Sequence, residues 1–116
     1  MNRKNVLLTG ATGFLGKNVV PVLSEEYDVI GIGSEWDLRD QQAVDNLFFE
    51  FDFDVIVHAA GSVGGILANR ENPGKFMYEN LIMGANLIEA GRQFGVDKFV
   101  LLGTVCAYPK FTPVPF

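Results

Sequence analysis

Three glycines at a regular spacing are the first candidates for chemistry in this chain. Gly10, Gly13 and Gly16 follow an apolar run at residues 5–8 and precede a second apolar run that begins at Phe14. A strand, a glycine turn and a helix in this order bind phosphate, because backbone N–H groups and the positive end of the helix dipole point at the ligand. We expect Gly10 to make the tight turn, Gly13 to let a pyrophosphate approach the backbone and Gly16 to pack the helix on the strand. The spacing predicts a dinucleotide-binding loop, and a glycine turn without a ligand is the alternative.

The residues after the second apolar run should contact the adenosine ribose of such a dinucleotide. Gly33 and Ser34 are uncharged and leave room for a 2′-phosphate, while Glu35 and Arg39 lie close by, so the choice between NADP and NAD is open from this stretch. A residue of the same loop would accept a hydrogen bond from the adenine amino group. Asp40 is also well placed to cap the helix that follows it, and both roles can hold together.

Apolar runs alternate with helical patterns along the chain. The predicted elements are strands at about residues 4–9, 27–32, 54–58 and 98–103, and helices at about 13–25, 41–51 and 73–94. Pro21 predicts a kink or a short first helix, because it lacks an N–H group. Residues 62–69 and 111–116 are expected to be irregular, and residues 35–38 to add a minor edge strand.

Two helices show periodic apolar residues that we expect to be buried. The candidates in the first helix are Phe14, Leu15, Val19, Val22 and Leu23, and those in the last are Met77, Leu81, Ala85 and Ile88.

Alternating strands and helices predict an α/β fold, a Rossmann-type doubly wound parallel sheet with right-handed crossovers. The expected spatial order is second, first, third and fourth strand, with the ligand at the switch point between the first and third. Because a complete sheet of this type has more strands, we expect a truncated version with about four. Residues 1–116 would then form the N-terminal portion of a dinucleotide-binding domain, without the substrate domain.

Composition excludes several classes of function. The net charge of −5 argues against nucleic-acid binding, and no run of about 18 apolar residues suggests a membrane span. His58 is the single histidine and is expected to pack in the core; no cluster has metal-ligand spacing. Cys106 is the single cysteine, so no internal disulfide can form, and we expect a cytoplasmic protein.

Further motifs point to a family. They are His-Ala-Ala-Gly at 58–61, Val-Gly-Gly-Ile at 63–66, Tyr-Glu-Asn at 78–80 and Gly-Thr-Val-Cys-Ala-Tyr-Pro-Lys at 103–110. With these motifs the chain resembles, over its whole length, the N-terminal part of an extended short-chain dehydrogenase/reductase of the NAD-dependent epimerase/dehydratase family. Within that family it looks like the nucleotide-sugar epimerase/reductases.

The resemblance implies a function and its ligands. It implies NADPH-dependent conversion of GDP-4-keto-6-deoxymannose to GDP-L-fucose, with NADP(H) favoured over NAD(H), a GDP-sugar as substrate and a homodimer as the assembly. Together with the glycine loop it implies these cofactor-binding residues: Gly10, Thr12, Gly13, Phe14, Leu15, Gly16, Ser34, Leu38, Asp40, Ala59, Ala60, Gly61, Asn80, Leu102, Gly103 and Thr104.

The resemblance also assigns two catalytic residues. Thr104 takes the position of a hydroxyl that hydrogen-bonds the 4-keto oxygen of the sugar. Cys106 takes the position of an acid/base that moves protons next to the keto group, a role that needs a thiol pKa near neutrality. Outside such a motif, a lone cysteine is more often a small buried apolar residue.

Two features of the family are missing from these residues. The arginine that the family uses for the 2′-phosphate would fall within 31–33, where the chain has Gly-Ile-Gly. No tyrosine is followed four residues later by lysine, so we expect the Tyr-x-x-x-Lys pair and the substrate domain beyond Phe116, and no turnover by residues 1–116 alone. The alternatives are a non-catalytic dinucleotide-binding module and another sugar-nucleotide epimerase or dehydratase.

Overall fold

The computed structural model describes residues 3–63, 66–103, 109–111 and 113–115. Its elements are β1 (Asn5–Thr9), α1 (Phe14–Leu23), β2 (Asp28–Ile32), α2 (Gln41–Glu50), β3 (Val55–His58), α3 (Ile66–Glu71), α4 (Pro73–Gln93) and β4 (Lys98–Leu101). The predicted α/β alternation is confirmed, and so is a Rossmann-like fold.

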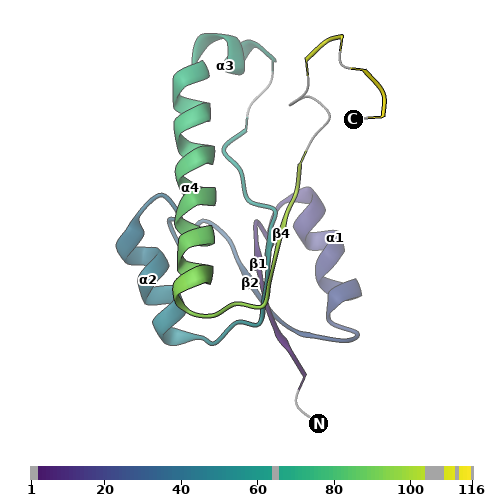
Figure 1. Cartoon of the computed structure of the whole chain (residues 1–116), viewed down its shortest axis with the longest axis vertical. Helices are drawn as coiled ribbons and strands as arrows, with labels where there is room; N and C mark the ends of the chain where they lie inside the picture. The colour runs from purple at the N-terminus through teal and green to yellow at the C-terminus, as the bar shows by residue number, and fades with distance from the viewer. Residues whose placement is uncertain (1–2, 64–65, 104–108, 112, 116) are drawn as a thin grey trace.

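The four strands form one parallel sheet in the order β2-β1-β3-β4. In the register, Leu7 of β1 lies between Ile30 of β2 and Ile56 of β3, and Ile56 lies beside Phe99 of β4. The predicted strand order is therefore correct, with β4 at an edge of the described sheet. Figure 1 shows α2 and α4 on one face of the sheet and α1 on the other.

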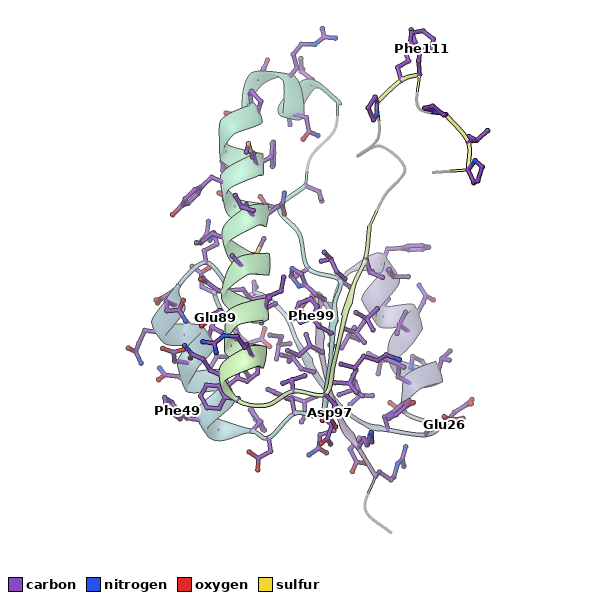
Figure 2. All side chains as sticks on the ribbon, in the orientation of Figure 1. Glu26, Phe49, Glu89, Asp97, Phe99 and Phe111 are labelled. Atoms are coloured by element: carbon purple, nitrogen blue, oxygen red, sulfur yellow. The ribbon has the colours of Figure 1, made fainter. Side chains whose placement is uncertain are left out.

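The main core lies between the sheet and the pair α2 and α4. Leu7 and Ile56 of the sheet are fully buried there, together with Leu47 of α2 and Leu87 of α4. Phe99 of β4 packs against the same cluster and points toward α4 (Figure 2). Burying each of these side chains contributes about 1.5–3 kcal/mol, so this layer holds the strand ends in place.

Three of the five α1 residues that were predicted to be buried are exposed. Phe14, Leu15 and Val22 are 81%, 46% and 66% exposed, while Val19 and Leu23 are half-buried. The only fully buried residue of α1 is Gly16, whose lack of a side chain lets the helix sit directly on the loop after β1. The helix face that contains Gly16 therefore meets the sheet, and the residues on either side of it are turned outward. As predicted from Pro21, the helix is short and ends at Leu23.

The stripe predicted for α4 is on the wrong face of the helix. Met77, Leu81 and Ile88 are 70%, 62% and 52% exposed, and Ala85 is exposed as well. The buried residues of α4 are Met83, Asn86, Leu87, Ala90 and Gly91. Asn86 belongs to this face because its side-chain amide donates to the carbonyl oxygen of Leu38 at 3.0 Å. Because this buried face contains a polar residue and a glycine, the spacing of apolar residues alone does not predict it.

Two loop predictions also differ from the structure. Residues 62–69 were expected to be irregular, but their second half belongs to the short helix α3 (Ile66–Glu71). Residues 35–38 form turns instead of an edge strand. The loop turns because its polar groups bond locally: the Asp37 carboxylate accepts from the backbone N–H of Arg39 at 3.0 Å. The predicted start and end of α4 are confirmed: Pro73 is its first residue, and Gly95 follows the helix with a φ of +73°.

Candidate dinucleotide-binding site

The three glycines of the first loop have different structural roles. Gly10 has a φ of +68°, and a Cβ there would lie 2.8 Å from the carbonyl carbon of Ala59. A Cβ on Gly16 would overlap the carbonyl oxygen of Gly10. At Gly13 the nearest atom to such a Cβ is the Gly10 oxygen at 3.4 Å, an ordinary contact. The fold therefore requires glycine at 10 and 16, whereas the space beside Gly13 is open.

Thr9 connects this loop to the one after β3. Its buried hydroxyl oxygen accepts from the backbone N–H groups of Ala59 at 3.1 Å and Ala60 at 3.0 Å. It also lies 2.7 Å from Nδ1 of His58, to which it donates its proton because its oxygen already accepts twice. Burial lowers the pKa of His58, which favours the neutral ring that this bond needs. As predicted, His58 is a core residue, 5% exposed.

A cavity of about 740 Å³ opens where β1, β2 and β3 end. Many of the residues predicted to bind the cofactor line it: Gly10, Thr12, Gly13, Phe14, Leu15, Gly16, Ser34, Leu38, Ala59, Ala60 and Gly61. This is the switch point of the sheet, because the chain leaves β1 toward β2 on one side and reaches β3 on the other. The volume lies within the range of small-molecule and cofactor pockets.

Of the predicted cofactor residues that the structure describes, four are not among those that line this cavity. The Asp40 carboxylate caps α2 by accepting from the backbone N–H of Gln42 at 3.0 Å. Asn80 holds the chain after β3: its side chain accepts from the N–H of Ser62 at 2.7 Å and donates to the carbonyl of the same residue at 2.9 Å. Leu102 and Gly103 are exposed at the end of β4. Asp40 and Asn80 shape the loops around the cavity.

At the polar end of the cavity, one arginine pairs with two carboxylates. The Arg39 guanidinium donates to both carboxylate oxygens of Asp37, at 2.9 and 3.1 Å, and lies 3.3 Å from the Glu79 carboxylate. The Arg39 side chain lowers the pKa of Asp37. The pKa of Glu79 is lowered chiefly by a hydrogen bond from the Ser62 side chain. The bridge ties the loop after β2 to α4.

Several residues that line the cavity were not among the predicted site residues. They are Ile32, Trp36, Asp37, Arg39, Ser62, Val63, Glu79 and Met83; Gly33, expected near the ribose, also lines the cavity. Most neighbour predicted residues in sequence, so extending each predicted segment by one or two residues would have found them. Met83 has no such signal, since only the packing of α4 brings it to the cavity.

The two predicted catalytic residues lie outside the described residues. Thr104 and Cys106 belong to a segment whose placement the structure does not describe. Within the described ranges no group of three or more acidic, histidine or cysteine residues could hold a metal ion. In the same ranges no helix is long and apolar enough to cross a membrane.

Comparison with known proteins identifies the family of this site. Residues 6–116 match the model of the NAD dependent epimerase/dehydratase family. The chain belongs to this family. The family resemblance predicted from the sequence motifs is thus confirmed.

Relatives of this epimerase/dehydratase chain are named as synthases of GDP-sugars. It is 42% identical to a GDP-L-colitose synthase of Yersinia pseudotuberculosis over 90% of the chain and 35% of that protein. It is 37% identical to a GDP-L-fucose synthase of Sinorhizobium fredii over 99% of the chain and 37% of that protein. The chain therefore spans about a third of the length of these relatives.

A solved structure of the same kind contains a dinucleotide. The GDP-L-fucose synthetase of Naegleria fowleri bound to NADP superposes with a TM-score of 0.86 at 28% identity, over 99% of this chain and 38% of that one. The chain therefore shares the fold of the corresponding part of a GDP-L-fucose synthetase that has been solved with NADP bound.

Proposed function

We propose that this chain binds a nicotinamide dinucleotide in the cavity at the ends of β1, β2 and β3. The observation that carries the proposal is the open space beside Gly13 at the start of α1. The fold demands glycine at 10 and 16, but packing alone does not demand it at 13. A ligand that approaches the backbone closely accounts for a glycine there.

The residues present fit the pyrophosphate of such a cofactor. The first N–H groups of α1 have no partners within the helix, and their dipole favours a negative group at this end. Phe14 and Leu15 line the cavity at this point although they are exposed. When bound, a nicotinamide supplies hydride chemistry. The role of the described residues is to bind the dinucleotide and to fix its orientation.

We further propose that the chain is the cofactor-binding part of a GDP-sugar epimerase/reductase, the conversion of GDP-4-keto-6-deoxymannose to GDP-L-fucose being the specific reaction. The names of the relatives and the motif at 103–110 support this substrate class. In this reading Thr104 orients the sugar carbonyl and Cys106 exchanges a proton beside it. Because one relative is named for GDP-L-colitose and another for GDP-L-fucose, the choice of sugar is the finer part of this proposal.

Residues 1–116 alone should not turn over this substrate. Reduction of a ketone needs a proton donor for the developing alkoxide. Tyr27, Tyr78 and Tyr108 each lack a lysine four residues later. The same observation keeps a non-catalytic dinucleotide-binding module as the second candidate. The homodimer and the cytoplasmic location expected from the sequence remain predictions.

Binding is tested by isothermal titration calorimetry of the chain with NADH and NADPH. Gly13→Val should fold, since a Cβ at 13 has room, and should abolish binding by filling the approach to the backbone. Gly74→Val is the matched control, because Gly74 lies in the first turn of α4 with no atom within 4 Å of a Cβ. Circular dichroism checks the folding of both variants. Equal affinity in wild type and a folded Gly13→Val variant, or no binding by the wild type, would refute the proposal.

A further inference from the structure

We propose that His58 is a positioning residue of the dinucleotide site: its neutral ring fixes the wall formed by Ala59 and Ala60, and protonation of the ring weakens dinucleotide binding. The inference rests on the proposed dinucleotide site and concerns the regulation of that site by pH. His58 is not among the residues that line the cavity, so it acts through the hydroxyl of Thr9.

The Thr9 hydroxyl has no capacity for a further hydrogen-bond donor. A hydroxyl has one proton and two lone pairs. The Thr9 oxygen accepts from the backbone N–H groups of Ala59 at 3.1 Å and Ala60 at 3.0 Å, and it lies 2.7 Å from Nδ1 of the ring. With both lone pairs occupied, the hydroxyl proton points at Nδ1, so this nitrogen accepts and the ring proton is on Nε2. A single tautomer of neutral His58 therefore satisfies all three hydrogen bonds at once.

A second proton on the ring conflicts with this arrangement. In the charged form of histidine both ring nitrogens carry a proton, so Nδ1 changes from an acceptor to a donor. Two donors then face each other across 2.7 Å, unless the Thr9 hydroxyl turns and accepts from the ring. Accepting from the ring takes a lone pair, so the N–H group of Ala59 or of Ala60 loses its partner. Both alanines line the cavity, so protonation of His58 displaces part of the cavity wall.

The described residues that face the His58 ring are uncharged. Thr9 faces it from β1, and the Phe99 ring of β4 lies edge to face, with the two ring centroids 6.3 Å apart. The face that α4 buries contains the polar Asn86 but no charged side chain. Burial is accordingly the cause that lowers the pKa of His58 from its ordinary value of about 6.5. The intact wall is therefore complete above this value and is lost as the pH falls through the lowered pKa.

The test is the pH dependence of dinucleotide affinity, measured by calorimetry between about pH 7.5 and 5.5. Histidine is the one side chain whose ordinary pKa lies in this range, and the chain has a single histidine. NADP⁺ and NAD⁺ are titrated in parallel, because the 2′-phosphate of NADP⁺ itself takes up a proton at a pH of about 6. His58→Asn provides an amide oxygen that can accept from Thr9 but does not titrate. Phe53→Leu is the control, because it alters a buried ring that precedes β3 and does not line the cavity.

We expect the affinity of the wild-type chain for NAD⁺ to fall by about three- to tenfold from neutral to acid pH, within the limit of about tenfold per pH unit for one proton. His58→Asn should bind NAD⁺ with nearly constant affinity over this range, whereas Phe53→Leu should keep the wild-type profile. For NADP⁺ the fall should be steeper in the wild type than in His58→Asn. Circular dichroism at each pH checks that every chain is folded.

A second measurement needs no variant. The imidazole C–H signal of the single histidine in NMR spectra gives the pKa of His58 with and without a saturating dinucleotide. Because linkage is reciprocal, the dinucleotide should lower this pKa. The same pH profile in wild type and His58→Asn, or a pKa of His58 that the dinucleotide leaves unchanged, would overturn the inference while leaving the dinucleotide site intact. Absence of binding by both dinucleotides at neutral pH would instead overturn the proposed function and the inference with it.

Discussion

The hydroxyl of Thr9 is the residue-scale link between the first strand and the cavity. It accepts from two consecutive backbone N–H groups after β3 and donates to the single histidine. All of these groups are buried or half-buried, so water cannot replace the hydroxyl at low cost. The position of Ala59 and Ala60 at the cavity wall therefore depends on one oxygen atom.

Replacing this oxygen should destabilise the fold. Thr9→Val keeps the shape of the side chain but leaves two N–H groups and Nδ1 of His58 without their partner, at a cost of about 2–4 kcal/mol in the free energy of unfolding. Thr9→Ser keeps the hydroxyl and should cost only about 1 kcal/mol for the lost methyl group. Urea denaturation followed by circular dichroism measures both. Equal losses in the two variants would mean that the hydroxyl is not the stabilising group.

At the scale of elements, α4 shows which of two apolar faces a helix buries. The face with Met77, Leu81 and Ile88 has the more regular apolar pattern, yet the sheet and α2 cover the face with Leu87. The contacts with other elements decide, and one of them is the bond from buried Asn86 to the loop before α2. Glu89, near the C-terminal end of α4, instead pairs with Arg92 at the surface (Figure 2).

Two matched leucines test this assignment. Leu87 is fully buried, so Leu87→Ala should lower the free energy of unfolding by about 2–5 kcal/mol through lost burial and a cavity. Leu81 is 62% exposed on the same helix, so Leu81→Ala should change it by less than about 0.5 kcal/mol. Chemical denaturation of the two variants side by side gives the comparison. A larger loss at Leu81 than at Leu87 would show that α4 packs through its other face.

These helices also show which parts of the fold a sequence can predict. The strands were found because short runs of Val, Leu and Ile between turn residues read the same whichever helix covers them. The buried faces of α1 and α4 were not, because Gly16 and Asn86 are buried for reasons of close approach and hydrogen bonding. Neither reason appears in a pattern of apolar residues.

At the scale of the whole molecule, the site exists because three parallel strands end together. The loops after β1, β2 and β3 meet in one cavity only when β1 lies between the other two strands. The glycine loop and the small residues after β3 could be predicted, since each follows its strand directly. The bridge from Arg39 to Glu79 could not, because it joins residues 40 positions apart that only the crossover of α4 brings together.

The most direct test of the account is where a dinucleotide binds on the folded chain. Two-dimensional ¹⁵N NMR spectra of the labelled chain, recorded during titration with NADH, report each backbone amide separately. We predict that shifts concentrate at residues 10–16, 33–39 and 59–63, with amides of the last turns of α4 unchanged. Saturating shifts confined to other surfaces, with the amides of residues 10–16 unmoved, would contradict the assignment of this cavity as the dinucleotide site.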